Sequence, residues 1–402
     1  MSFPSRCSLY AELLANIRQI SLAASLTSPS DASTRVAVAA DGSTIELTHH
    51  GEVHKLTLPA KTPLSGTLLP IDQRQRGTTA LSWRLPLGAT VPAQVSSTDI
   101  PTWSATDFEA GTQITCRQCN AVVVEEEATK VWKDLPSENW AEMMEFWHCH
   151  KPDHGHDDGH DNDHSHDEHS GKSDENSLAA RGYGASSIIS AQPGVGFIDL
   201  TTILFAESDC RNITYSSSTF EQGKPNIGDL PATNTRSLNV LCSSCHSQLG
   251  FYVFRTAAVT LLKWQVSCKS ISGSAPGITE CLAATIISTI SRSASSKSLI
   301  MPINETESEG KQIVIYAWVF NANIVYSSSN GANGTPAIKL LYQRISREEA
   351  DKMLEEVTCE AQEINLPAMG IERVVEHLEE SNGLLPEKER VFKEWRVGLL
   401  TR

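Results

Sequence analysis

Two short cysteine pairs, far apart in the chain, constrain the fold more than any other feature of the sequence. They are Cys116-Arg-Gln-Cys119 and Cys242-Ser-Ser-Cys245, with more than 120 residues between them. Four thiolates are the usual ligand set of a closed, tetrahedral structural zinc site. We therefore expect one zinc ion, held by these four cysteines, that joins two hairpin turns of a central sheet and offers no open position for catalysis.

The remaining cysteines do not indicate a disulfide framework. Disulfides need an oxidising compartment and are most frequent in small secreted scaffolds. This chain has 402 residues, and its N-terminus lacks the pattern of a secretory signal. We expect four of its ten cysteines to be small buried hydrophobic residues, namely Cys7, Cys210, Cys268 and Cys281. If no zinc binds, the two cysteine pairs are core residues as well.

Length and charge exclude several classes of protein. A chain of 402 residues allows two or three domains, and no run approaches about 18 apolar residues, so we expect no membrane span. The net charge of -15 argues against direct nucleic-acid binding, which needs a basic surface. We expect a cytoplasmic and nuclear protein.

Residues 151–180 form a His/Asp-rich insert. Eight of the thirteen histidines lie between positions 148 and 169, and residues 153–176 carry nine acids and one lysine. Such a stretch buries too little apolar surface to offset its ordering entropy, so we expect it to be disordered and to bind transition metals weakly. His148, Cys149 and His150 at its start are alternative ligands for the zinc site.

Residues 1–105 are expected to be a β-rich N-terminal region. Short runs with period-two alternation predict strands at 9–14, 34–39, 44–48, 53–58 and 80–85. A hairpin connection falls at residues 49–52. We expect its histidines, and His54 beyond it, to be exposed strand and turn residues and not metal ligands.

Residues 106–265 are expected to be the zinc-stapled β domain. Strand, knuckle and strand recur at 112–126 and 238–255, and 195–205 reads as one buried strand. After the first knuckle, Ser137 is a plausible helix N-cap, and two tryptophans follow at helical spacing. This segment is either a helix packed on the core or a docking surface. Its candidate partner-binding residues are Ser137, Glu138, Asn139, Trp140 and Trp147.

Residues 266–402 have the pattern of a C-terminal α+β region. Helices are predicted at 279–291, 347–357 and 370–380, and strands at 298–303, 312–320, 323–327 and 338–344, with a loop at 327–335 and a closing segment at 391–400. The chain as a whole is therefore predicted to be a β-rich α+β protein.

Cys359 follows the predicted helix at 347–357 in a turn-like segment. A thiol there acts as an acyl acceptor when its surroundings favour the thiolate. The glutamates at positions 355, 356, 360 and 363 disfavour that form. Local chemistry alone therefore favours an ordinary cysteine.

Four motifs in this order carry a family resemblance: the first knuckle, Leu135-Pro-Ser-Glu-Asn-Trp140, Trp147-His-Cys149-His150, and the second knuckle with Leu249-Gly250. The set resembles the HECT-like ubiquitin-conjugating-enzyme (E2)-binding family of E3 proteins. The resemblance implies an E3 ubiquitin-protein ligase that binds a charged E2. It also implies a second role, in which the protein binds and blocks the zinc-dependent endonuclease subunit of the pre-mRNA cleavage and polyadenylation machinery.

Two shorter similarities refine these expectations. The paired knuckles, the second followed by Leu-Gly and an aromatic residue, are similar to β-tent zinc folds such as Yippee-like proteins. Thr358-Cys359 with Leu366-Pro367 is similar to the catalytic-cysteine loop of HECT ligases, with one extra residue between cysteine and proline. Cys359 is therefore the candidate catalytic residue of an E3 ligase. The alternative is a non-catalytic inhibitor of the endonuclease, and metal storage by the histidine-rich insert is a third hypothesis.

Overall fold

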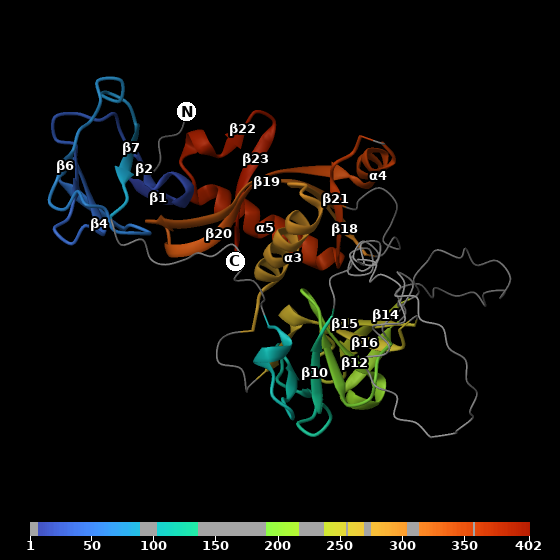
Figure 1. The fold of residues 1–402 in the computed structure, drawn as a ribbon. Coiled ribbons are helices and arrows are strands. Elements are labelled where there is room, and N and C mark those ends of the chain that lie inside the picture. The colour runs from blue at the N-terminus through green and yellow to red at the C-terminus, as the bar shows by residue number, and fades with distance from the viewer. Residues whose placement is uncertain are drawn as a thin grey trace, which may run out of the picture. The chain divides into compact units, whose positions relative to one another are not determined.

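The structure is a computed structural model that describes residues 7–88, 103–135, 190–216, 237–254, 256–268, 275–303, 313–356 and 358–402. It is β-rich with α-helices, which confirms the predicted class. The chain forms two compact units (Figure 1), one of Met1–Thr102 with Ala275–Arg402 and one of Trp103–Ser274. The sequence pattern predicts three consecutive regions. In the structure, its first and last regions belong to the same compact unit.

The long hairpin of β19 (Ile313–Ser328) and β20 (Ala332–Ser346) unites the first and last parts of the chain. The beginning of β19 pairs with β18 (Lys297–Pro302), and its end pairs with β1 (Ser8–Leu14) near the N-terminus. Both pairings are antiparallel. One strand therefore contributes backbone hydrogen bonds to neighbours that are about 300 positions apart in sequence.

The larger sheet of this unit has the order β22-β23-β20-β19-β1-β2-β7, and β21 joins it through β18. A smaller sheet has the order β5-β4-β3-β6. The bounds of these strands are β2 (Gln19–Ser25), β3 (Arg35–Val38), β4 (Thr44–His49), β5 (Glu52–Thr57), β6 (Leu68–Leu69), β7 (Ala80–Pro86), β21 (Gln362–Leu366), β22 (Val391–Phe392) and β23 (Trp395–Thr401).

Strand β1 separates two hydrophobic cores because successive side chains of a strand point to opposite faces. Leu9, Ala11 and Leu13 enter the core that also contains the inward residues of the smaller sheet. Tyr10 enters a second core with residues of β19, β20 and β23. Strand β1 is therefore buried on both of its faces, whereas the period-two pattern that predicted it indicates burial of one face only.

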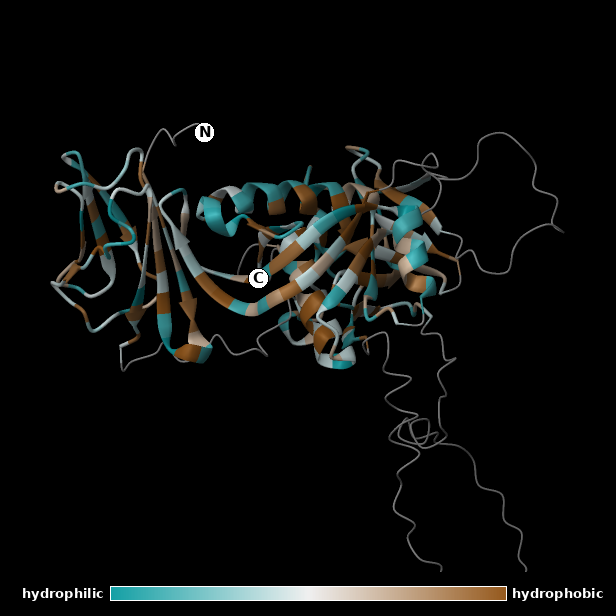
Figure 2. Cartoon of the chain, turned by 90° about the horizontal axis from the view of Figure 1, so that it is seen from above, coloured by the Kyte–Doolittle hydropathy of each residue, from teal (hydrophilic) through white to brown (hydrophobic). Residues whose placement is uncertain are grey.

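Three α-helices, α3 (Ile278–Ser293), α4 (Arg347–Glu355) and α5 (Ala368–Leu384), belong to the same unit. Helix α3 contacts α5 and β23, and α5 contacts β18, β19 and β23. The helices carry both hydrophobic and hydrophilic residues (Figure 2), as expected where one face packs on a sheet. No helix in the described part of the chain is long and apolar enough to cross a membrane.

The second unit contains a seven-stranded sheet, β10-β11-β12-β16-β15-β14-β13, and a three-stranded sheet, β17-β8-β9. Their bounds are β8 (Ile114–Cys116), β9 (Val122–Val124), β10 (Val131–Asp134), β11 (Val195–Ile198), β12 (Thr202–Ala206), β13 (Ile213–Ser216), β14 (Ser237–Cys242), β15 (Gln248–Val253), β16 (Ala258–Leu262) and β17 (Val266–Cys268). Short 3-10 helices occupy Ala15–Ile17, Ala105–Asp107, Glu207–Asp209, Lys263–Gln265 and Glu387–Glu389.

Several predicted element boundaries were wrong. The segment 195–205 is a hairpin of β11 and β12, closed by a hydrogen bond from Asp199 N to Thr202 O of 2.9 Å. The strands predicted at 312–320 and 323–327 are the single strand β19, whose register shifts between Val319 and Ile324. Such irregularities interrupt the alternation on which the prediction depended. Strand β2 was missed.

Three further predictions concern the hairpin histidines, the helix that begins near Ser137 and the insert 151–180. His49 is buried, with 2% of its surface exposed, so the expectation that the hairpin histidines are all exposed was wrong. The helix predicted from Ser137 and the insert 151–180 lie outside the described residues.

A buried ion pair links β1 to β20. Lys339 Nζ donates to Glu12 Oε2 at 2.8 Å and to Glu389 Oε2 at 3.2 Å, and Tyr10 Oη also donates to Glu12 Oε2. Burial lowers the pKa of Lys339, but the two carboxylates outweigh burial and raise it overall. The ammonium group of Lys339 therefore stays charged inside the unit.

We predict that Lys339→Met lowers the free energy of unfolding by about 3 kcal/mol, because it leaves the Glu12 carboxylate buried without its cation. Denaturant unfolding measures the change. The double variant with Glu12→Gln should recover part of the loss. Lys55→Met is the matched control, since its ion pair with Glu46 is exposed and should contribute little. Equal losses for Lys339→Met and Lys55→Met would contradict the prediction.

Candidate metal centre

Each cysteine pair lies in a turn that joins two antiparallel strands. In the first, Cys116 N donates to Ala121 O and Asn120 N donates to Cys116 O, both at 2.8 Å. In the second, Cys242 N donates to Ser247 O at 2.9 Å, and His246 N donates to Cys242 O at 2.8 Å. The two turns therefore have the same backbone hydrogen bonds around their first cysteine.

The residue after the second cysteine has a left-handed conformation in both turns. Asn120 has φ 61° and His246 has φ 59°. Asparagine and histidine are among the non-glycine residues that adopt this region most readily. This conformation reverses the chain directly after the knuckle, so that both cysteines of a pair face the same point.

The two pairs meet in space. Cys116 Sγ lies 3.7 Å from Cys245 Sγ, and Cys119 Sγ lies 3.6 Å from Cys242 Sγ. All four Sγ atoms lie within 4.8 Å of one another. Cys116 and Cys242 are fully buried, whereas Cys119 lies at the surface.

These distances match a tetrahedral metal site and do not match disulfides. A tetrahedron with metal–sulfur bonds of about 2.3 Å has sulfur–sulfur edges of about 3.8 Å. A disulfide bond is only about 2.05 Å long. The four cysteines therefore fit a single four-coordinate metal site, as predicted from their spacing.

The two knuckles belong to different sheets, although one central sheet was expected. Strands β8 and β9 flank Cys116 and Cys119 in the three-stranded sheet, and β14 and β15 flank Cys242 and Cys245 in the seven-stranded sheet. A metal ion bound here would connect the two sheets.

Asn212 also connects the two knuckles, which the sequence analysis did not foresee. Its side-chain Nδ2 donates to Val122 O, next to the first knuckle, at 2.8 Å. Its carbonyl oxygen accepts from Ser243 N, inside the second knuckle, at 2.9 Å. Asn212 has a left-handed backbone conformation, with φ 52°. This conformation directs its side-chain amide toward the first knuckle and its carbonyl group toward the second. Asn212 belongs to no recognisable motif, because it precedes the second knuckle by thirty positions.

The metal-free thiols have unequal acidities. Burial raises the pKa of Cys116. For Cys119, the backbone hydrogen bond at Ala121 lowers the pKa, but burial and the neighbouring thiols raise it to about 12 overall. The hydrogen bond with Ser247 lowers the pKa of Cys245 to about 6; its Sγ is 2.7 Å from Ser247 Oγ. A divalent cation would allow all four thiols to ionise together.

Gly250 explains why Leu249-Gly250 follows the second knuckle. A Cβ atom at this position would lie 1.9 Å from the carbonyl oxygen of Thr260 on the neighbouring strand β16. Any other residue would therefore separate β15 from β16. The glycine keeps the strand that leaves the knuckle close to the sheet.

The alternative metal ligands and the candidate docking residues cannot be placed. His148, Cys149 and His150 lie outside the described residues, and so do Ser137, Glu138, Asn139, Trp140 and Trp147. Leu135 is the last described residue before this stretch, and its N–H donates to Ile198 O at 2.7 Å. The segment predicted to dock a partner therefore follows strand β10 in the sequence.

Cys359 belongs to the other compact unit. It lies between α4 and β21, is half-buried, and packs against a core cluster that includes Leu299, Met301 and Val314. Its backbone N–H donates to Glu356 O at 2.9 Å. The candidate catalytic cysteine and the four clustered cysteines therefore belong to different units, and Cys359 is partly covered within its own unit.

A family model described as "HECT-like Ubiquitin-conjugating enzyme (E2)-binding" matches residues 12–397. The chain belongs to this family. It is 24% identical over 286 residues to the uncharacterized protein YJR141W of Saccharomyces cerevisiae, covering 71% of this chain and 67% of the yeast protein. No solved structure matches this HECT-like chain. The family model covers most of both compact units.

We predict one zinc ion per chain in protein from which residues 151–175 are deleted, because the deletion removes histidines that bind metal weakly. Elemental analysis measures the metal. Cys116→Ser should abolish the bound zinc and destabilise the protein, since three thiolates no longer close the site.

Cys281→Ala is the matched control. Cys281 is fully buried in α3, in the other unit, so its loss should leave the zinc content unchanged. Absence of zinc from the deletion protein would mean that the four clustered cysteines are core residues only.

Proposed function

We propose that this HECT-like protein binds ubiquitin-conjugating enzymes and acts in the transfer of ubiquitin to protein substrates. The observation that carries the proposal is the family match across residues 12–397. Because the match spans both compact units, the binding function is assigned to the whole chain and not to one knuckle.

The four-cysteine centre has a structural role in this proposal, and zinc is its metal. Four cysteine ligands complete a tetrahedron, so no position remains for a substrate or water. A catalytic zinc normally retains one such position. The chemistry of ubiquitin transfer must therefore take place elsewhere.

Cys359 is the proposed acceptor if the protein carries ubiquitin itself. Its Sγ, as the thiolate, would attack the carbonyl carbon of the ubiquitin–E2 thioester. The bond from that carbon to the E2 sulfur would break, and the E2 cysteine would leave as a thiolate, so that charge and protons balance. Partial burial of Cys359 against the α4 core cluster requires the segment before β21 to move before an E2 can approach. Direct transfer from the bound E2 to the substrate needs no such movement.

Endonuclease inhibition stays a prediction from the family resemblance. Its candidate segment, residues 135–147, is described only at Leu135. No described residue favours it over E2 binding.

We predict that the full chain forms a complex with at least one purified E2 that carries thioester-linked ubiquitin. Size-exclusion chromatography across a panel of charged E2 enzymes measures this. The variant that lacks residues 151–175 should bind equally, because the His/Asp-rich insert has no part in the proposal. Absence of a complex and of any change in E2 discharge across the panel would overturn the proposed function.

We also predict that a ubiquitin adduct, if it forms, is cleaved by thiol reductants and disappears in Cys359→Ala. Non-reducing electrophoresis after incubation with a charged E2 shows the adduct. Cys281→Ala is again the control, because that thiol is fully buried. A reducible adduct that persists in Cys359→Ala would assign the acceptor to another cysteine, whereas E2 discharge without any adduct would indicate direct transfer.

A further inference from the structure

An aromatic face lies on one side of the larger sheet. It consists of Tyr316 and Trp318 of β19, Trp395 of β23 and Phe392 of β22. The ring centroid of Trp395 lies 4.8 Å from that of Tyr316 and 6.0 Å from that of Trp318. Tyr316 and Trp318 are half-buried, and Phe392 is 49% exposed. The aromatic face is therefore partly open to solvent.

Strand register places these four side chains on the same side of the sheet. Residues directly opposite each other in an antiparallel pair project to the same side. One such row crosses from β18 to β23 through Lys297, Trp318, Leu341 and Val397. Tyr316 and Trp395 each lie two positions from a member of this row, so they project to its side. Phe392 is directly opposite Trp395.

Helix α5 packs on the other side of the same strands. Gly398 follows Val397, so it faces away from the aromatic face. A Cβ atom at Gly398 would lie 2.8 Å from Leu378 Cδ2 of α5. This part of the sheet therefore packs on a helix with one side and presents aromatic rings on the other.

Cys359 adjoins the aromatic face through Tyr316. Tyr316 packs against the core cluster that contains Trp395, and it also packs against the α4 cluster that Cys359 contacts. Burial raises the pKa of Tyr316, Lys297 opposes this rise, and the charges of Cys359 and Glu360 add to it. A partner bound on the aromatic face would therefore lie next to the proposed acceptor of ubiquitin.

The border of the aromatic face on the Cys359 side is acidic. Residues 347–363, which include α4, carry seven acidic and two basic side chains. Glu355, Glu356 and Glu360 are exposed. Lys297 Nζ lies 6.0 Å from the centroid of the Trp318 ring, and it is paired with Glu360 at 3.3 Å. An apolar partner surface with a basic border would complement this arrangement.

The opposite end of the aromatic face has balanced charges. Lys393 Nζ lies 5.8 Å from the centroid of the Phe392 ring, and the exposed Glu394 is the next residue. The charge of the surface is therefore uneven, which would set the orientation of a docked partner.

We propose that the aromatic face binds the ubiquitin that a charged E2 carries, with its acidic border meeting basic side chains of ubiquitin. Ubiquitin presents an apolar patch bordered by lysine and arginine side chains, which is the complement of this surface. Large aromatic side chains contribute much of the binding free energy at protein interfaces. The inference rests on the proposed function, and it adds the surface that holds ubiquitin beside Cys359.

Weak binding of ubiquitin is sufficient in this arrangement. The thioester links ubiquitin to the E2, so a bound E2 raises the local concentration of ubiquitin at the aromatic face. The two contacts then act together. The protein should therefore bind a charged E2 more tightly than the same E2 without ubiquitin.

The first test uses the full chain and isotope-labelled free ubiquitin, with no E2 present. We expect changes in the NMR shifts of the apolar patch of ubiquitin. Phe392→Ala should weaken this binding about tenfold, because it removes an exposed ring of the aromatic face. Phe254→Ala is the matched control, since Phe254 is 53% exposed and belongs to the other unit.

A second variant tests the acidic border. Glu355→Lys together with Glu356→Lys should weaken ubiquitin binding and change its dependence on salt, because the new charges repel the basic border of ubiquitin. Glu126→Lys together with Glu127→Lys is the matched control, since these two glutamates are also adjacent and exposed but belong to the other unit. Circular dichroism shows whether each variant is folded.

Two results would overturn the proposal: folded protein that leaves the spectrum of free ubiquitin unchanged, or equal losses for Phe392→Ala and Phe254→Ala. Binding of uncharged E2 separates the proposal from the proposed function. Both test variants should bind uncharged E2 as the unaltered chain does. Loss of that binding in Phe392→Ala would assign the aromatic face to the E2 and not to ubiquitin, and the proposed function would stand. Failure of the unaltered chain to bind any E2 would instead contradict the proposed function.

Discussion

Backbone pairing along β19 is the constraint on which the larger unit depends. This strand pairs with β1, β18 and β20, so the first and last parts of the chain share one set of sheet hydrogen bonds. The alternating faces of β1 then contribute to two cores. The buried contact between Lys339 and Glu12 joins the same two parts of the chain. The N-terminal residues are therefore integral to the unit that contains Cys359.

The second unit depends on a different interaction, the approach of four thiols. Burial raises the pKa of Cys116, and the buried thiols of Cys116 and Cys242 would be poorly compensated without a cation. A divalent metal bound here would compensate these thiols and would join two sheets that also meet through the hydrogen bonds of Asn212. The family membership assigns ubiquitin-related function to a chain whose metal site has no vacant position.

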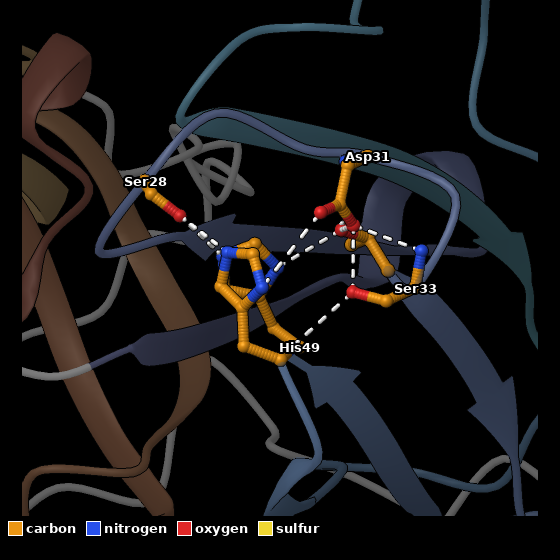
Figure 3. A network of polar contacts seen from close by, with 6 residues as sticks. Ser28, Asp31, Ser33 and His49 are labelled. Carbon is orange, nitrogen blue, oxygen red and sulfur yellow. Dashed lines mark hydrogen bonds and ion pairs between the residues drawn. The ribbon is translucent and has the colours of Figure 1, made fainter.

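The polar contacts of Ser28, Thr34, Asp31, His49 and His50 (Figure 3) illustrate how a sheet can bring together polar groups from segments without a motif. Asp31 and Ser33 come from the turn before β3, whereas His49 and His50 come from the tip of the next hairpin. The β3–β4 pairing aligns these two ends, with Arg35 opposite Thr48. In the sequence, two adjacent histidines before a glycine predict only a turn. The burial of His49 depends on its contacts with Thr34 and Ser28.

The sequence by itself determined the class of the fold and the four cysteines of the metal centre. Both depend on local patterns: alternation along strands, and thiols spaced so that one turn holds two of them. The sequence also predicts a docking segment, from a helix N-cap and two tryptophans at helical spacing, and a disordered insert, from composition. Both predictions lie outside the described residues. Only the tertiary structure decided that residues near both termini share one unit, that Asn212 connects the knuckles, and that Ser28 meets two histidines. These arrangements follow from strand pairing between distant segments, which leaves no spacing in the sequence by which to recognise it.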